Sequence, residues 1–246
     1  MMTLSKKRIL ITGASSGIGR ATAVLCAELG ASVILTARRQ QELERTLAEM
    51  RDRKSHSIVA GDVTDGEFIE KLVSSMGKID GFVHAAGIGQ ACPIGMIKND
   101  YVERMIRTNY FSFLELMKYF SKSKYRADKL SIVAVSSVSS VVGWAGGAVY
   151  CGTKGALCAS VRALAVELAS KGVRVNAISP SNIKTPAFDR MVSEFGVDKV
   201  ASLEAAQPLG FGAPEQVASA ICFLLSDAAS FITGVNLPVD GGFVAK

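Results

Sequence analysis

The sequence predicts an α/β fold in which one doubly wound sheet of seven parallel strands carries helices on both faces. Seven short runs rich in Ile and Val alternate with amphipathic stretches along the 246 residues. These runs are apolar throughout, which is typical of strands that are covered on both faces. The first run leads directly into a glycine-rich turn and then a helical stretch, as at the start of a strand–helix–strand unit.

Each element follows from its local pattern of residues. The expected strands are 8–12, 32–36, 57–60, 80–85, 131–136, 173–179 and 234–239. The expected helices, which place apolar residues at helical spacing, are 17–29, 39–53, 66–76, 100–123, 151–171 and 214–226. No repeat, linker or low-complexity tract interrupts this alternation, so we expect a single domain that spans residues 1–246.

The segment 181–212 departs from the alternation. It mixes prolines and glycines with apolar residues, among them Phe188, Met191, Phe195 and Leu203. A connection of this length inside a compact domain is typically a lid or a binding segment. We therefore expect it to cover a substrate.

Composition and charge exclude several classes of protein. No window approaches 18 uncharged apolar residues and the N-terminus lacks a small-residue cleavage site, so we expect neither a membrane span nor a signal peptide. The five cysteines are scattered and there are only two histidines, which predicts no metal site and a reducing, cytoplasmic location. The net charge of +6 is spread along the chain, which argues against nucleic-acid binding.

One stretch, 118–129, is more densely basic than the rest. A solvated helix end and loop is its ordinary interpretation. The alternative is a docking surface for an acidic partner, and the sequence leaves both open.

The glycine-rich turn TGASSGIG (12–19) predicts a phosphate-binding loop. Gly13 permits the tight turn after the strand, Gly17 allows close approach of a pyrophosphate, and Gly19 allows close helix packing. The helix N-terminus adds unpaired N–H groups. A nucleoside-triphosphate P-loop is excluded, because Arg20 and Ala21 occupy the positions of its Lys and Ser/Thr. The turn residues expected to bind a dinucleotide are Gly13, Ser15, Ser16, Gly17, Ile18 and Gly19.

The end of the second expected strand indicates which dinucleotide binds. It carries Arg38 and Arg39, and no acidic residue lies between Glu28 and Glu42. A guanidinium binds the 2′-phosphate of NADP, whereas a carboxylate at this position binds the 2′-hydroxyl of NAD. We therefore predict NADP(H) over NAD(H); the alternative is that both arginines only form the exposed start of a helix.

Two stretches match the pattern Tyr-x-x-x-Lys: YCGTK (150–154) and YRADK (125–129). The first opens an apolar-faced helix, and its tyrosine follows Ser137 by thirteen residues. The second lies in a polar connection before a strand, where nothing would desolvate the phenol. Further motifs lie along the whole chain: GDV at 61–63, AAG at 85–87, Asn109 in RTNYF, SS at 136–137, RVNAISP at 174–180 and PVDGG at 238–242.

In this order and spacing the motifs resemble those of the short-chain dehydrogenase/reductase family, in the branch with TGxxxGxG and YxxxK. The resemblance covers essentially the whole chain. It implies a Rossmann-type domain that transfers a hydride between a nicotinamide cofactor and a ketone or secondary alcohol. It also implies that Tyr150, not Tyr125, is the catalytic tyrosine.

The chemistry of such a site explains its residues. A carbonyl that accepts a hydride needs a proton, and a phenol is a weak acid with a pKa of about 10. Lys154, one helical turn from Tyr150, is expected to lower that pKa by its charge. Ser137 is expected to polarise the substrate oxygen. By resemblance, Lys154 also binds the nicotinamide ribose, and Asn109 holds a water that completes a proton relay.

The resemblance assigns further cofactor contacts. Asp62 and Val63 correspond to the pair beside the adenine. The wall beside the adenosine ribose is Ala85, Ala86 and Gly87, and the segment around the nicotinamide carboxamide is Pro180, Ile183 and Thr185.

Three positions depart from the family pattern. His84 stands where the family has Asn before AAG, Ser181 replaces the Gly after Pro180, and Cys151 follows the catalytic tyrosine. We expect His84 to substitute structurally, Ser181 to stiffen or re-aim the lid, and Cys151 to pack.

These observations predict an NADP(H)-dependent carbonyl reductase or alcohol dehydrogenase, similar to the 3-oxoacyl-[acyl-carrier-protein] reductases, with an acyl carrier protein as a candidate partner of the basic stretch. The sequence does not choose between apolar and sugar substrates. By family analogy we expect a homo-oligomer, a tetramer or a dimer. A non-catalytic NADP-binding regulator or scaffold is the main alternative, although such relatives typically lose the tyrosine or the lysine. A methyltransferase is the third, but it would carry an acid where Arg38 stands.

Overall fold

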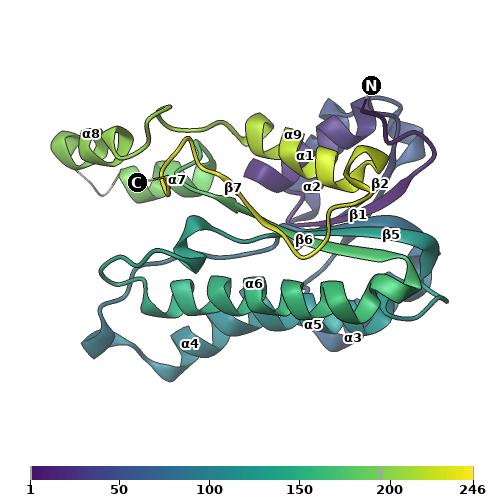
Figure 1. Ribbon diagram of the computed structural model, residues 1–246, viewed down its shortest axis with the longest axis horizontal. Helices are drawn as coiled ribbons and strands as arrows, with labels where there is room; N and C mark the ends of the chain where they lie inside the picture. The colour runs from purple at the N-terminus through teal and green to yellow at the C-terminus, as the bar shows by residue number, and fades with distance from the viewer. Residues whose placement is uncertain (1, 194–195, 246) are drawn as a thin grey trace.

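A sheet of seven parallel strands in the order β3-β2-β1-β4-β5-β6-β7 forms the centre of the computed structural model, which describes residues 2–193 and 196–245 (Figure 1). The predicted doubly wound sheet is therefore confirmed. The strands are β1 Arg8–Thr12, β2 Ser32–Ala37, β3 Ser57–Ala60, β4 Ile79–His84, β5 Arg126–Val135, β6 Val173–Pro180 and β7 Asn236–Val239.

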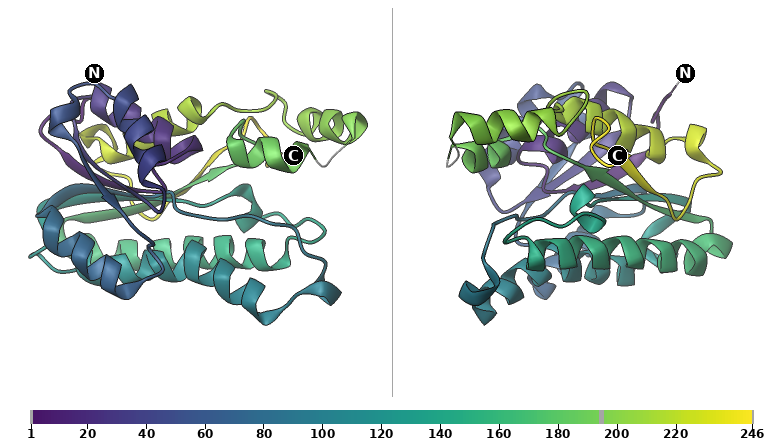
Figure 2. Two further views of the ribbon diagram at one scale, coloured as in Figure 1. Left: turned by 180° about the vertical axis from the view of Figure 1, so that it is seen from behind. Right: turned by 60° about the vertical axis from the view of Figure 1, so that its left-hand side comes forward.

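Helices cover both faces of the sheet (Figures 1 and 2). On one face lie α1 Gly17–Glu28, α2 Gln40–Glu49 and α9 Pro214–Leu225, and on the other α3 Gly66–Met76, α4 Asn99–Ile106, α5 Ser112–Phe120 and α6 Ala148–Leu168. Ile9 and Ile11 of β1 pack into one hydrophobic core, and Leu10 packs into the other. The strands are apolar throughout because neighbouring residues face different cores.

The expected helix 100–123 is interrupted. Between α4 and α5 the backbone forms a π-helical turn, Arg107–Phe111, with Asn109 at its centre. Such turns are rare and concentrate at functional sites. The 3.6-residue periodicity gave no sign of it, because the helix axis continues on both sides.

The strand β5 begins at Arg126, five residues before the predicted start at Ser131. Its first residue pairs with Ile79 of β4, after which the register shifts before Ser131 pairs with Gly81. The Arg126 side chain is buried and donates hydrogen bonds to the Ala127 and Asp128 carbonyls. Sequence periodicity missed this irregular start because its residues are polar.

The segment 181–212 contains two helices, α7 Pro186–Val192 and α8 Val197–Ala205, which extend beyond the carboxyl edge of the sheet (Figures 1 and 2). Thr185 accepts a hydrogen bond from the Phe188 N–H and caps α7, and Pro186 occupies the first turn, where it is tolerated. Lys184 donates its N–H to the Gly212 carbonyl and so joins the two ends of the segment. Phe195, which we expected in this segment, lies outside the described residues.

Across residues 2–193 and 196–245, no helix combines the length and hydropathy that crossing a membrane requires. The same residues bring together no group of three or more His, Cys, Asp or Glu side chains suited to a metal ion. All five cysteines are free thiols.

Candidate active site

The candidate site lies at the carboxyl edge of the sheet, where the order of strands reverses between β1 and β4. In parallel sheets a crevice opens at this point, because successive crossovers leave in opposite directions. The glycine turn leaves β1, the AAG stretch leaves β4, and Ser137 follows β5. The fold therefore brings together the motifs that lie far apart in the sequence.

The glycine turn has the geometry that phosphate binding needs. Gly13 and Gly17 have positive φ angles of 67° and 53°, a region that favours glycine. A methyl group on Gly13 would lie 2.6 Å from the Ala85 carbonyl oxygen, and one on Gly17 would lie 3.1 Å from Thr185 Cγ2. A side chain on Gly19 would clash with the Gly13 carbonyl. The close packing at Gly19 is therefore against its own turn and not, as expected, between the helix and the sheet. These close contacts keep the turn compact at the start of α1, and the N-terminal N–H groups of a helix are suited to binding a pyrophosphate.

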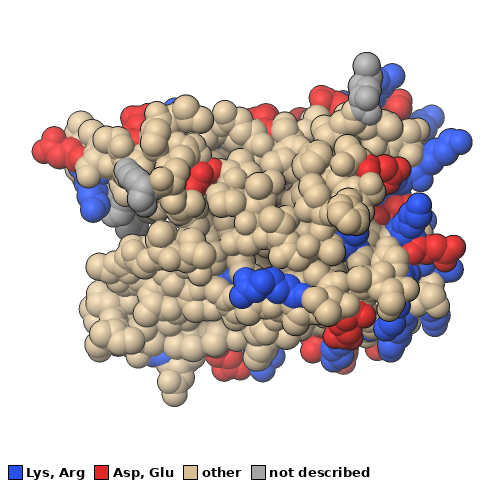
Figure 3. Space-filling view, in the orientation of Figure 1, with Lys and Arg blue, Asp and Glu red and all other residues tan. Residues whose placement is uncertain are grey.

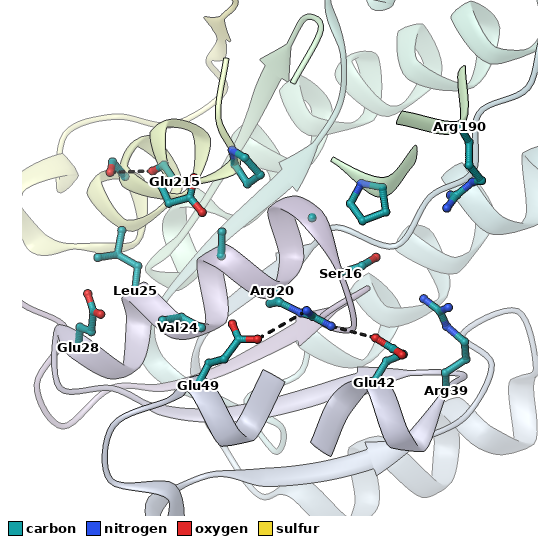
Figure 4. A pocket seen from close by; sticks show the side chains of 15 residues that line it. Ser16, Arg20, Val24, Leu25, Glu28, Arg39, Glu42, Glu49, Arg190 and Glu215 are labelled. Atoms are coloured by element: carbon teal, nitrogen blue, oxygen red, sulfur yellow. Dashed lines mark hydrogen bonds and ion pairs between the residues drawn. The ribbon is translucent and has the colours of Figure 1, made fainter. Parts of the chain in front are cut away.

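A pocket of about 540 Å³ extends from this turn along α1, between α2 and α9, with α7 at the end near the turn (Figure 4). Arg20 is neutralised in it by ion pairs with Glu42, at 3.0 Å, and Glu49, at 3.6 Å. Arg39 and Arg190 flank the end of the pocket near Ser16 (Figure 4). Arg38 is exposed and does not line this pocket. Sequence analysis missed Arg190, which comes from the segment 181–212.

Tyr150, Ser137 and Lys154 meet at the mouth of the crevice. The Ser137 side chain is near enough to the Tyr150 hydroxyl to lower the pKa of the phenol. Lys154 is almost fully buried, its ammonium lies 5.7 Å from the centre of the Tyr150 ring, and it donates a hydrogen bond of 2.9 Å to the Val135 carbonyl. Trp144 lies beside the tyrosine, with ring centres 6.3 Å apart. Helix α6 supplies both Tyr150 and Lys154, because residues four apart share one helix face.

The electrostatics of this group differ from the prediction. Burial raises the pKa of Tyr150 above its ordinary value, and the Ser137 side chain offsets only part of that effect. The expected net lowering of this pKa is therefore wrong for this structure. Burial also lowers the pKa of Lys154 to about 8. Both shifts follow mainly from removing the charged forms from water.

Asn109 joins three parts of the site. It is fully buried, and its Oδ1 accepts from the Ile88 N–H at 2.8 Å, while its Nδ2 donates to the Ile88 carbonyl and to Thr153 Oγ1. A methyl group on Gly87 would lie 3.5 Å from Asn109 Oδ1 and 3.6 Å from Lys154 Nζ. Gly87 therefore borders a space between the asparagine and the lysine. Sequence analysis did not single out Thr153, although its position three residues after Tyr150 places it on the adjoining helix face.

The other expected cofactor residues surround the same crevice. Asp62 Oδ1 accepts from the N–H and the hydroxyl of Thr64, and this holds the turn in which Val63 is buried. The Ala86 N–H donates to Thr12 Oγ1 at 3.2 Å. Pro180 ends β6, and Ile183 pairs with Gly212 across the base of the segment 181–212. Ala85 and Thr185 lie against the glycine turn.

The three departures from the family pattern have local partners. Ser181 Oγ donates to the Asp240 carbonyl at 3.0 Å and so anchors the base of the segment 181–212 to the end of β7. Cys151 Sγ lies 3.7 Å from the Val142 carbonyl oxygen. His84 is buried at the end of β4 between Thr12 and Ser112.

These residues fit a nicotinamide dinucleotide. The positive φ angles of Gly13 and Gly17 fold the turn tightly at the start of α1, whose first N–H groups have no partner within the helix. Ser137 and Tyr150 present hydroxyls at the other end of the crevice, and Lys154 retains donors beyond its bond to Val135. The arrangement can bind a phosphate, orient a ring and move one proton.

Comparison with known proteins agrees with this geometry. A family model described as Enoyl-(Acyl carrier protein) reductase matches residues 13–244. The chain is 33% identical to a 3-oxoacyl-[acyl-carrier-protein] reductase of Rickettsia conorii over 99% of both chains. It is 36% identical to an L-rhamnose 1-dehydrogenase (NAD(P)(+)) of Sphingomonas sp. over 98% of both. A short-chain type dehydrogenase/reductase from Mycobacterium ulcerans superposes with a TM-score of 0.89 at 28% identity, covering 99% of this chain and 92% of the other.

Proposed function

Because the chain belongs to the short-chain dehydrogenase/reductase family, we propose that it transfers a hydride between NADP(H) and a ketone or secondary alcohol, with Tyr150 as the general acid and base. The observation that carries the proposal is the meeting of Tyr150, Ser137 and Lys154 at the carboxyl edge, in the crevice that the glycine turn opens. Fold alone would not carry it, since this fold hosts many functions.

The nicotinamide supplies the hydride or accepts it. In the reductive direction, Ser137 and Tyr150 both donate hydrogen bonds to the substrate oxygen, and Tyr150 releases its proton as negative charge develops there. The raised pKa of Tyr150 keeps the phenol protonated at neutral pH, which suits the acid role in reduction. In the oxidative direction the phenolate is required, so rising pH favours that reaction.

Lys154 and Asn109 support this proton transfer. The Lys154 ammonium stabilises the phenolate that forms on Tyr150 and binds the nicotinamide ribose with its remaining donors. Asn109 borders the space beside Lys154 and holds a water that passes a proton toward Tyr150. Gly87 keeps that space open because it carries no side chain.

The preference for NADP(H) over NAD(H) rests on the guanidinium of Arg39. It flanks the pocket beside the glycine turn and forms no ion pair with a described residue. The neighbouring Arg20 is held by two glutamates, and Arg38 adds positive charge at the rim. A guanidinium without an ion-pair partner beside the adenosine site favours a 2′-phosphate on the ribose over a 2′-hydroxyl.

The substrate proposal is a 3-oxoacyl thioester or a related ketone, by analogy with the relative from Rickettsia conorii. A sugar is the alternative substrate, by analogy with the L-rhamnose 1-dehydrogenase of Sphingomonas sp.. Trp144 forms an apolar wall beside Tyr150, and Phe188 packs on Phe211 in the segment 181–212, with ring centres 4.8 Å apart. These walls support a partly apolar substrate, and the segment 181–212 is our candidate for the lid that covers it.

The basic stretch 118–129 does not favour docking of an acyl carrier protein near this site. It lies at the amino end of β5, and that ten-residue strand separates it from Ser137 by about 30 Å. In Figure 3, Lys and Arg side chains gather at the end of the molecule opposite α7 and α8. Lys118 pairs with Glu115, and Lys122 and Lys124 lie over the Tyr119 and Tyr125 rings.

The homo-oligomer stays a proposal. Exposed Phe111 and Val166 lie on the helix face of the sheet that carries α4 to α6, where a second copy could cover them. Size-exclusion chromatography with light scattering measures the state directly.

Absorbance of NADPH, followed with a panel of oxoacyl thioesters, sugar ketones and steroid ketones, tests the function. We expect oxidation with at least one panel member and affinity for NADPH at least about tenfold above that for NADH. Arg39→Ala should remove most of this preference, while Arg51→Ala, a matched surface variant, should keep it. Tight NADPH binding without turnover on any substrate would favour the regulator instead, and a preference for NADH would overturn the cofactor assignment.

A further inference from the structure

His84 is the last residue of β4 and is only 1% exposed, yet its ring is hydrogen-bonded on both sides. Nδ1 lies 3.2 Å from Thr12 Oγ1 at the end of β1. Nε2 lies 3.5 Å, a long hydrogen bond, from Ser112 Oγ in the first turn of α5. The imidazole therefore connects two elements that approach the cofactor crevice from different sides.

The partners of these two hydroxyls decide the direction of each bond. Thr12 Oγ1 accepts from the Ala86 N–H at 3.2 Å, so its own proton is directed to His84 Nδ1. Ser112 Oγ donates to the Thr108 carbonyl at 2.7 Å, so toward His84 it offers a lone pair. His84 must then accept at Nδ1 and donate at Nε2. One tautomer, the neutral Nε2–H form, satisfies every group in this chain.

The surroundings of the ring favour the neutral form. Phe82 and Phe113 pack against it with ring centres 6.0 and 5.5 Å away. Burial, followed by the nearby Lys154 cation, lowers the pKa of His84 to about 3. A charged imidazole would place a second buried cation beside Lys154 and would turn Nδ1 into a donor facing a donor.

Both ends of this chain of hydrogen bonds reach groups that the proposed reaction uses. Thr12 adjoins Gly13 of the phosphate-binding turn and receives the N–H of Ala86, beside the adenosine ribose site. Ser112 holds the carbonyl of Thr108, the neighbour of Asn109 in the π-helical turn. A shift of the ring would therefore move the cofactor wall on one side and Asn109 on the other.

We propose that His84 is a positioning residue for hydride transfer, which as the Nε2–H tautomer aligns the cofactor wall at Thr12 and Ala86 with the π-helical turn that carries Asn109. The proposal rests on the proposed function. It assigns to one side chain two separable effects, one on cofactor affinity and one on turnover.

Nuclear magnetic resonance of the imidazole nitrogens tests the tautomer, and the chain has only two histidines, His56 and His84. Long-range ¹H–¹⁵N spectra of the full chain, with His56→Gln to assign the signals, should show His84 with an unprotonated Nδ1 and a protonated Nε2. The signals should not change between about pH 8 and about pH 5. A protonated Nδ1, or a ring that titrates in this range, would overturn the proposal. This result does not depend on turnover.

Two conservative variants separate the two effects. Asn places a polar group near Nδ1 and keeps the Thr12 bond, whereas Gln places an amide near Nε2 and keeps the Ser112 bond. We expect His84→Asn to lower kcat about fivefold to twentyfold with the NADPH dissociation constant within about twofold of wild type. We expect His84→Gln to weaken NADPH binding about fivefold to twentyfold, with kcat less affected. Melting temperatures identify any variant that is merely unstable.

Ser112→Ala completes a double-mutant cycle. It removes the acceptor of the Nε2–H group together with the donor to the Thr108 carbonyl, and both belong to the same chain of hydrogen bonds, so its effect on kcat should not add to that of His84→Asn. Additive effects, or variants that change the melting temperature while kcat and NADPH affinity stay within twofold, would overturn the proposal. A wild-type protein that binds NADPH but turns over no ketone would overturn the proposed function instead. The tautomer of His84 and the NADPH affinity of His84→Gln could then still be measured, because neither measurement requires turnover.

Discussion

Tyr150–Lys154 and Tyr125–Lys129 share one pattern in the sequence but lie in different structures at opposite edges of the sheet. The first pair lies on α6, where residues four apart have β-carbons about 6 Å from one another. In the second pair, Tyr125 directly precedes β5 and Lys129 lies within it, so an extended chain separates them by about 13 Å. The same five-residue pattern produces a phenol–ammonium neighbourhood only when it is helical.

Burial differs as much as spacing. Lys154 is almost fully buried and Ser137 lowers the pKa of Tyr150. In contrast, Lys129 is exposed and Tyr125 packs on Tyr119 with ring centres 5.4 Å apart. The Lys124 ammonium lies over the Tyr125 ring in place of the lysine of its own motif. The comparison teaches that the local structure and burial of a tyrosine, and not the sequence pattern alone, make it a candidate acid.

The largest expected effect on kcat comes from replacing the tyrosine in each of the two motifs. Tyr150→Phe should lower kcat about 10²-fold or more, because no other described group is placed to donate the proton, and should leave the NADPH dissociation constant within about twofold. Tyr125→Phe, which removes the same hydroxyl from the other motif, should leave kcat unchanged. Steady-state NADPH oxidation and fluorescence titration measure both. Equal losses in the two variants would refute the distinction.

Replacing the lysine of each motif should have the next largest effect on activity. At Lys154 we expect activity to fall while the free energy of unfolding rises. Lys154→Met should lower kcat/KM about tenfold to a hundredfold and yet raise the free energy of unfolding at pH 7 by about 1–2 kcal/mol. The pKa of Lys154 is about 8 in the fold and about 10.5 when unfolded, so the unfolded chain binds more protons between these values. Stability contributed by this group therefore rises with pH through that window and is lowest below pH 8.

Urea denaturation at pH 7 and at pH 10 measures this change in stability. The gain from Lys154→Met should shrink at the higher pH, because the wild-type lysine is then neutral in the fold. Lys129→Met alters an exposed side chain and should change stability by less than about 0.5 kcal/mol at either pH. A clear loss of stability in Lys154→Met at pH 7 would contradict the burial argument.

A smaller effect on kcat tests whether the space beside Lys154 holds the water of the proposed relay. Gly87→Ala adds a methyl group 3.5 Å from Asn109 Oδ1 and 3.6 Å from Lys154 Nζ, an ordinary contact that the fold tolerates. We expect a threefold to tenfold lower kcat, because the methyl group displaces the water of the proposed relay. Gly95→Ala, whose methyl group would meet nothing within 4 Å, is the matched control. Unchanged kcat in Gly87→Ala would argue against a relay through this space.

The smallest effect concerns pH. Because burial raises the pKa of Tyr150 above its ordinary value, reduction should keep its rate as the pH rises from neutral into the alkaline range. Oxidation needs the phenolate and should accelerate as pH rises over the same range. Measuring kcat in both directions against pH checks this sign, and reduction that declines from pH 7 upward would contradict it.

The sequence predicted the sheet because its strands are buried on both faces, and this leaves unbroken runs such as ILI in β1. It predicted the pairing of Tyr150 with Lys154, because helical spacing alone places the two residues on one face. It missed α7 and α8, which are short and lie among glycines and prolines, although Thr185 and Pro186 are a helix-start signal.

Other features depend on contacts that no local pattern contains. The π-helical turn around Asn109 continues the axis of α4 and α5, so periodicity does not reveal it. The direction of the Tyr150 pKa shift depends on how burial of the phenol compares with the opposing effect of Ser137. His84 was expected to substitute structurally, but its partners Thr12 and Ser112 come from elements 72 and 28 residues away.

The account depends most on Tyr150 standing within reach of the reacting oxygen when cofactor and substrate are bound. A crystal structure of the wild-type protein with NADP⁺ and an alcohol that it oxidises tests this directly. We expect the Tyr150 hydroxyl about 2.6–3.2 Å from the alcohol oxygen, with the reacting carbon about 3–3.5 Å from the nicotinamide. A nicotinamide bound elsewhere, with Tyr150 about 10 Å or more from the alcohol oxygen, would contradict the account.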